Sequence, residues 1–197
     1  MLREPTTSNR RALMTVLMVA GALVVFPVAV AATDAPPPDP EAEINSPNSD
    51  FSEIVDEGFT FRWRIDGDEI EAIMSAPTTG YVAVGFHPTR MKLDAEIVIG
   101  FVEDGTAHVQ HHYATAPVSH ESLEDLGEQS HVTVVDASEE DGVTTIHFRL
   151  PLSYGGEYDQ PLIPGELTPV IWAYGPDDAN NFADYHGGSA GSFEIEL

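Results

Sequence analysis

The sequence predicts an all-β fold, an antiparallel immunoglobulin-like β-sandwich of roughly nine to eleven strands. Three observations predict it. Apolar and polar residues alternate with a period of two in short segments, turns rich in Gly and Asp separate these segments, and no window of about 11 residues has helical periodicity. The chain has 197 residues, which is enough for one domain with short appendages.

Residues 1–31 are predicted to be a secretory signal peptide. Arg10–Arg11 precede the apolar run Leu13–Phe26, Pro27 ends it, and Ala29–Ala31 offers small residues for cleavage. A retained membrane anchor is the alternative, because Ala12–Ala31 is just long enough to span a bilayer. The paired arginines leave both twin-arginine and general export open. We expect a secreted or extracytoplasmic protein, in the periplasm or at the cell surface, with no membrane span after cleavage.

Residues 32–50 predict a spacer, because proline, acidic and small polar residues cannot bury a core. The folded domain is expected over residues 51–197. Its first strand shows the alternation clearly: Phe61, Trp63 and Ile65 are separated by Arg62 and Arg64, so one face is buried and the other is wet. The expected strands are Phe61–Ile65, Glu69–Ala76, Tyr81–His87, Glu96–Val102, Thr106–Tyr113, His131–Ala137, Val143–Leu150, Pro169–Tyr174 and Ser192–Leu197. Four long loops remain, and loops carry functional residues more often than strands do: Pro88–Asp94, Ala114–Ser130, Ser153–Leu167 and Gly175–Gly191.

The charge of the chain excludes several partners. There are 33 acidic and eight basic residues, a formal net charge of −25, and only one lysine, Lys92. Nucleic acids and anionic membrane surfaces need a basic patch, so neither is an expected partner. Such a surface is best tolerated in concentrated salt, which favours a salt-adapted source over an ordinary acidic secreted protein.

Several kinds of chemistry are also excluded. The absence of cysteine rules out disulfides, thiolate metal sites and covalently attached c-type haem. The sequence has no Gly-rich phosphate loop, G-x-S-x-G elbow or H-E-x-x-H motif. We therefore do not expect this chain to be an enzyme by itself.

An ordered series of motifs resembles the DOMON domain family over most of Phe59–Leu197. These motifs are Gly80–Phe86, His87–Met91, Ile97–Val102 followed by Asp104-Gly105, Glu140–Leu152, Val170–Gly175, and Tyr185-His186 before a last strand. Cytochrome-type members, such as the b-type haem domain of cellobiose dehydrogenase, hold haem between an axial Met and an axial His. By motif position, the resemblance implies Met91 and His186 as the iron ligands.

The resemblance implies an exported b-type haem domain that acts in one-electron transfer with a redox partner protein. A thioether and an imidazole complete six-coordination, so the iron exchanges electrons and binds no oxygen. Other family members bind sugars or have no assigned ligand, so a haem-free module that binds a sugar or another small molecule is the alternative. Family members in copper monooxygenases carry their chemistry in separate copper domains, for which this chain has no room.

The haem b pocket is expected as an apolar slot between loops at one end of the sandwich. The side chains expected to line it are Phe86, Trp172, Tyr174 and Phe182. His120, in the long loop after Ala114, is the reserve candidate for the axial ligand in place of His186. Arg90 and Lys92 flank Met91 and are expected to pair with a haem propionate, to contact an acidic partner, or to be solvated loop charges.

Three further histidines offer a rival metal site. On a strand, His111 points away from the face that carries His108 and His112. His108 and His112 lie about 13 Å apart at the rise of a strand, too far to share one ion. We expect these three to be solvated or to pair between strands.

Overall fold

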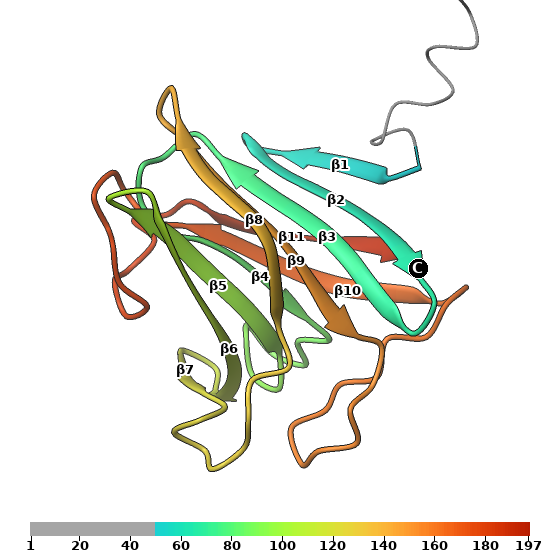
Figure 1. Cartoon of the computed structure of the whole chain (residues 1–197). Coiled ribbons are helices and arrows are strands. Elements are labelled where there is room, and N and C mark those ends of the chain that lie inside the picture. The colour runs from blue at the N-terminus through green and yellow to red at the C-terminus, as the bar shows by residue number, and fades with distance from the viewer. Residues whose placement is uncertain (1–49) are drawn as a thin grey trace, which may run out of the picture. The chain divides into compact units, whose positions relative to one another are not determined.

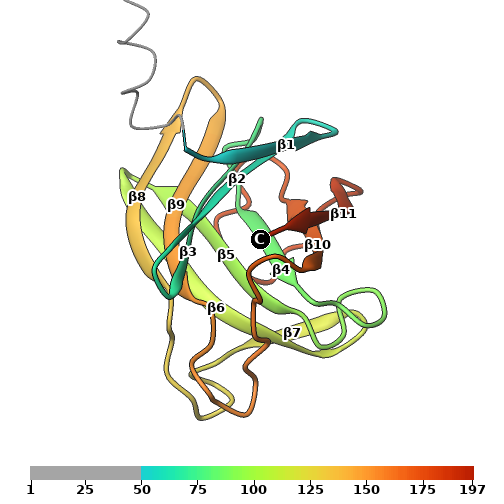
Figure 2. The ribbon, with the colours of Figure 1, turned by 90° about the vertical axis from the view of Figure 1, so that its right-hand side faces the viewer.

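The computed structural model describes residues 50–197, which form eleven strands and no helix. Two antiparallel sheets face each other, as the two views in Figures 1 and 2 agree, so the predicted all-β sandwich is confirmed. The five-stranded sheet has the order β1-β2-β3-β9-β8, and the six-stranded sheet has the order β11-β10-β4-β5-β6-β7. The strands are β1 Ser52–Asp56, β2 Phe59–Asp66, β3 Glu69–Ala76, β4 Val82–Phe86, β5 Glu96–Glu103, β6 Thr106–Ala116, β7 Ser119–Ser122, β8 Thr133–Glu140, β9 Val143–Pro151, β10 Leu167–Tyr174 and β11 Ala190–Glu196.

The core between the sheets follows from the alternation in the sequence. In β2, Phe59, Phe61 and Trp63 are buried, while the residues between them are partly exposed. Phe59 stacks on Trp172 of the opposite sheet at 5.1 Å between ring centroids, and Phe61 packs edge-on against Phe86 at 6.2 Å. Aromatic pairs of this kind add stability beyond the area they bury.

The two central strands of the six-stranded sheet are buried on both faces. All of β4 is buried, and so is β5 from Glu96 to Val102. Inward residues join the main core, whereas outward ones form a second apolar cluster with loop residues on the far side of the sheet. A strand buried on both sides loses the alternation of an amphipathic strand, which explains the nearly continuous apolar run in β5.

Two short strands were not predicted. β1 pairs with β2 at one edge, and β7 pairs with the end of β6 at the other, so part of the expected loop Ala114–Ser130 is a hairpin. Both segments are short and mostly polar, which gives too few apolar positions to show a period. The predicted signal peptide and nearly all of the predicted spacer lie outside the described residues. Within residues 50–197 no helix could cross a membrane.

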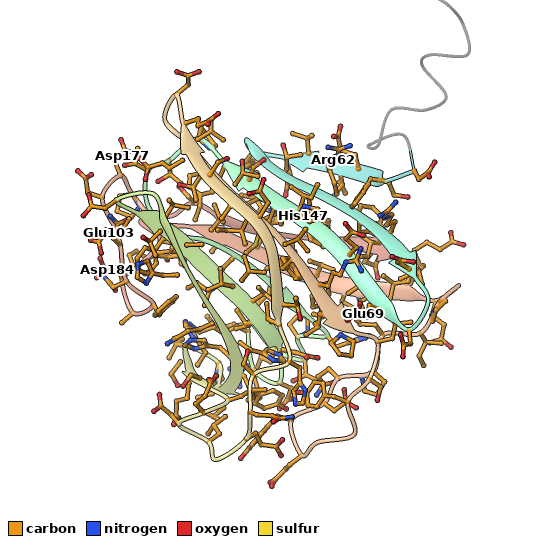
Figure 3. All side chains as sticks on the ribbon, in the orientation of Figure 1. Arg62, Glu69, Glu103, His147, Asp177 and Asp184 are labelled. Atoms are coloured by element: carbon orange, nitrogen blue, oxygen red, sulfur yellow. The ribbon has the colours of Figure 1, made fainter. Side chains whose placement is uncertain are left out.

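Most of the basic residues in the described part lie on the outer face of the five-stranded sheet, where Figure 3 labels Arg62, His147 and Glu69. Glu71, on β3, lies 2.7 Å from Arg64 Nη2, 2.9 Å from Arg149 Nη2 and 2.8 Å from His147 Nε2. Burial opposes ionisation of Glu71, but these hydrogen bonds and charges outweigh it, so the pKa of its carboxyl is lowered. Glu71 is therefore an ionised anchor between β2, β3 and β9.

Candidate functional site

A cavity of about 1070 Å³ lies on the outer face of the six-stranded sheet. Its floor follows from the register: one row of outward residues crosses all six strands, in the order Ser192, Ile171, Gly85, Ile97, His112, Ser122, and the first four of these border the cavity. Gly85 keeps this row low at its centre, because a Cβ there would lie 3.0 Å from the Cγ1 atoms of Ile97 and Ile171. Ala83 and Ile99 extend the floor along β4 and β5. Apart from Ser192, the floor is therefore apolar.

Three loops from distant parts of the chain wall the cavity. The β4–β5 loop contributes Met91 and Lys92, the β6–β7 hairpin contributes Val118 and His120, and the β10–β11 loop contributes residues 182–186. The last loop packs on the outer face of the sheet through Ala179 and Phe182, and Figure 3 labels its Asp184.

Two contacts fix the β10–β11 loop against the sheet. The Tyr81 hydroxyl donates a hydrogen bond to the Asp184 carbonyl oxygen at 2.9 Å. The ring of Phe182 lies 5.1 Å from that of Phe101 and 5.9 Å from that of His112. These contacts hold the loop that carries His186 against the sheet that forms the floor.

Met91 stands at the mouth of the cavity in a tight loop. The Leu93 amide donates to the Arg90 carbonyl, and the Ala95 amide donates to the Lys92 carbonyl, each at 3.0 Å. Met91 adopts a φ of 54° and is 64% exposed. A left-handed conformation is costly for a long side chain, and such strain gathers at binding sites. The loop thus presents a thioether at the mouth instead of burying it in a core.

His186 stands in the β10–β11 loop. The Gly188 amide donates to its Nδ1 at 3.3 Å, and its ring lies 4.4 Å from that of Tyr185. Burial lowers the pKa of His186, and the charge of Lys92 lowers it further. The imidazole is therefore neutral at neutral pH, which is the form that binds metals.

His120, which borders the cavity, forms a close pair with His112. Their Nδ1 atoms lie 2.8 Å apart, so one nitrogen must donate and the other accept. His112 Nε2 lies 2.8 Å from Gln110 Oε1. If His112 donates to that oxygen, His120 Nδ1 must donate to His112, which leaves the Nε2 lone pair of His120 unused. Burial lowers the pKa of both histidines to about 4, and the charge of Lys92 contributes to both shifts.

The structure brings together some of the residues predicted for the site and separates others. Met91, His186, Phe182 and Trp172 all border the cavity. The Trp172 indole, however, lies in the inner core and donates to Asp56 Oδ2 at 2.9 Å.

Phe86 and Tyr174 do not border the cavity. Phe86 is buried between the sheets, and Tyr174 packs against the same inner cluster. The cavity thus lies on the outer face of a sheet and not at the expected end of the sandwich, and Phe86 and Tyr174 point away from it because alternate residues of a strand point to opposite faces. The missed signal was the apolar character of the outward positions Ala83, Ile97 and Ile99.

The rival histidines behave as expected. His111 points inward and lies 2.9 Å from Glu96, with both side chains buried. His108 points outward and stacks on Phe101 at 4.9 Å. Within residues 50–197 no three His, Cys, Asp or Glu side chains are grouped to hold a metal ion.

Comparison with curated proteins finds relatives that are much longer. DBH-like monooxygenase protein 1 of Homo sapiens is 29% identical over 136 residues, which is 68% of this chain and 21% of that protein. Its Mus musculus counterpart is 29% identical over 140 residues, which is 71% of this chain and 22% of that protein. The chain therefore spans about a fifth of the length of these relatives.

Comparison with solved structures finds the same fold. The cytochrome domain of cellobiose dehydrogenase from Myriococcum thermophilum has a TM-score of 0.58 at 14% identity, covering 75% of this chain and 81% of that one. The cytochrome b domain of pyranose dehydrogenase from Coprinopsis cinerea has a TM-score of 0.57 at 15% identity, covering 74% and 80%. The family model of the DOMON domain matches residues 55–175, more than half of the sequence. This chain belongs to the DOMON domain family.

Proposed function

We propose that this domain binds haem b in the cavity and transfers single electrons. The observation that carries the proposal is that Met91 and His186, 95 positions apart in sequence, border one cavity with a largely apolar floor. A thioether and a neutral imidazole are the ligand types of electron-transfer haem. The two solved structures of like fold are cytochrome domains, which supports the same assignment.

The residues present fit this group. Ile97, Ile99 and Ile171 supply an apolar surface that would exclude water from the faces of a porphyrin. Met91 and His186 would hold the iron, and His120 stays the reserve imidazole. Haem so held supplies a one-electron couple without an open coordination position, and a methionine ligand raises its potential.

We further infer that the domain works outside the cytoplasm with a redox partner protein. The mouth of the cavity carries the exposed apolar side chains Met91, Val118 and Tyr185, and the chain as a whole is strongly acidic. A partner with an apolar patch and basic surroundings fits this face, because opposite charge steers association.

A haem-free module for a sugar or another small molecule is the second candidate. Tyr185 favours it, because this aromatic ring is 73% exposed at the mouth of the cavity and would offer a stacking surface. Binding of such a molecule needs no metal ligand, so this function would not require Met91.

The deciding experiment is a visible spectrum of the exported protein produced with haem supplied. Haem binding predicts a stoichiometric low-spin spectrum, with sharp bands after reduction, that Met91→Ala and His186→Ala each alter. A spectrum of free haem from folded protein would refute the proposal. Sugar binding by that same sample would then favour the second candidate.

A further inference from the structure

Lys92 is the only lysine in the sequence, and within residues 50–197 it lacks the ion pair that Arg62, Arg64 and Arg149 have. Arg64 and Arg149 lie within 3 Å of Glu71, and Arg62 lies 3.4 Å from Glu53. Within the described part of the chain, no carboxylate lies within 4.0 Å of the Lys92 ammonium, and no hydrogen bond reaches it. This is unexpected in a chain with four times as many acidic as basic residues.

Lys92 borders the cavity and is partly buried. His120 and His186 border the same cavity. The lysine therefore belongs to the same site as two of the candidate imidazole ligands.

The acidic residues of the cavity do not neutralise this charge. Asp184 and Glu194 border the cavity, but neither pairs with Lys92. The Asp184 carboxylate instead accepts a hydrogen bond from Asn181 Nδ2 at 2.7 Å. A partly desolvated cation without a counter-ion carries an energetic penalty, and a ligand that brings a negative group would reduce this penalty.

We propose that Lys92 binds a carboxylate of the ligand, so that the cavity takes a flat apolar molecule with an acidic edge. The floor of Gly85, Ile97 and Ile171 selects the flat apolar body, and the ammonium at the wall selects the carboxylate. Identifying that carboxylate as a haem propionate rests on the proposed function. The selectivity for an acidic ligand depends only on the unpaired charge of Lys92 and not on the identity of the ligand.

The test compares two iron-free probes, protoporphyrin IX and its dimethyl ester, in which methylation removes the charges of the two acid groups. Binding is followed by porphyrin fluorescence, which needs no axial ligand. Lys92→Gln should weaken binding of the diacid about tenfold, as expected for a lost charge-assisted hydrogen bond, and leave the diester unchanged. Lys92→Arg should retain most of the preference for the diacid.

Arg90→Gln is the matched control, because Arg90 belongs to the same loop and does not border the cavity. Equal weakening by Lys92→Gln and Arg90→Gln would overturn the proposal, since it would indicate only a general effect of charge. Equal affinity of the wild-type protein for diacid and diester, or no binding of either, would also overturn it.

Haem itself then separates the two proposals. Loss of the diacid preference in Lys92→Gln, together with haem spectra that do not respond to Met91→Ala or His186→Ala, would keep the Lys92 proposal and refute the axial ligands. The melting temperature checks folding: Lys92→Gln should be at least as stable as wild type, because it removes an unpaired charge.

Discussion

Acid should destabilise this domain through the His112–His120 pair before its carboxylates titrate. Both imidazoles have a pKa of about 4 in the folded protein, against the ordinary value of 6.5. The fold thus favours the neutral form, and the unfolded chain binds protons first as the pH falls. The contribution of the two histidines should therefore lower the free energy of unfolding below about pH 6.5 and level off near pH 4.

The size of the effect follows from the same two values. While an imidazole stays neutral in the folded protein and is protonated in the unfolded chain, the free energy of unfolding falls by about 1.4 kcal/mol for each pH unit of acidification. Between neutral pH and pH 5 this amounts to about 2 kcal/mol for each histidine, and to at most about 4 kcal/mol for the pair. For a domain of this size the melting temperature should fall by roughly 8–16 °C.

The assay is urea unfolding at several pH values for the wild type and for His112→Gln/His120→Gln. The double variant should lose about 1 kcal/mol at neutral pH, for one hydrogen bond, and then show a flatter dependence between pH 6.5 and 5. His108→Gln is the control, because His108 lies on the same strand and face as His112. This variant should keep the pH dependence of unfolding that the His112–His120 pair gives the wild type. Parallel curves for wild type and double variant would refute the reasoning.

Three other predictions concern the ligands, the outer face of the five-stranded sheet, and salt. With haem supplied, Met91→Ala should give a five-coordinate or water-ligated iron of lower potential, and His186→Ala should abolish retention of the haem. Unchanged spectra in both variants would contradict this ligand assignment and favour His120 as the axial ligand. Glu71→Gln should lower the free energy of unfolding by about 2–4 kcal/mol at neutral pH, because the arginines lose a buried partner. The difference should narrow below the ordinary glutamate pKa and close only once the pH falls below the lowered pKa of Glu71. Glu53→Gln, which changes an exposed partner of Arg62, should stay within about 0.5 kcal/mol, and equal effects would contradict the argument. The melting temperature should rise from dilute to molar salt, because salt screens repulsion among the acidic residues, and a constant value would exclude salt adaptation.

The sequence predicted the sandwich because alternation is a local property. Phe61 and Trp63 show their inward direction within one strand, and Asp66-Gly67-Asp68 shows where the next strand begins. The edge strands β1 and β7 escaped prediction because each is held by pairing to a longer neighbour.

The candidate site was only partly predictable. Met91 and His186 were identified through a family resemblance, and the fold brings both to one cavity. Phe86 and Tyr174 were assigned to the site because they are aromatic and near loops, although strand parity sends them to the inner core. The position of Lys92 depends on how three loops meet, which a linear pattern does not record.

A ligand bound on the floor of the cavity would also affect how much of the protein survives. β4 and β5 carry apolar side chains on both faces, so one sheet separates the core from the floor. A ligand that binds this floor stabilises the folded state. At a ligand concentration of a hundred times its dissociation constant, the free energy of unfolding rises by about 2.7 kcal/mol. Because proteases remove unfolded chains, ligand supply would set the amount of surviving protein. Pulse-chase half-lives with and without added porphyrin would measure this dependence.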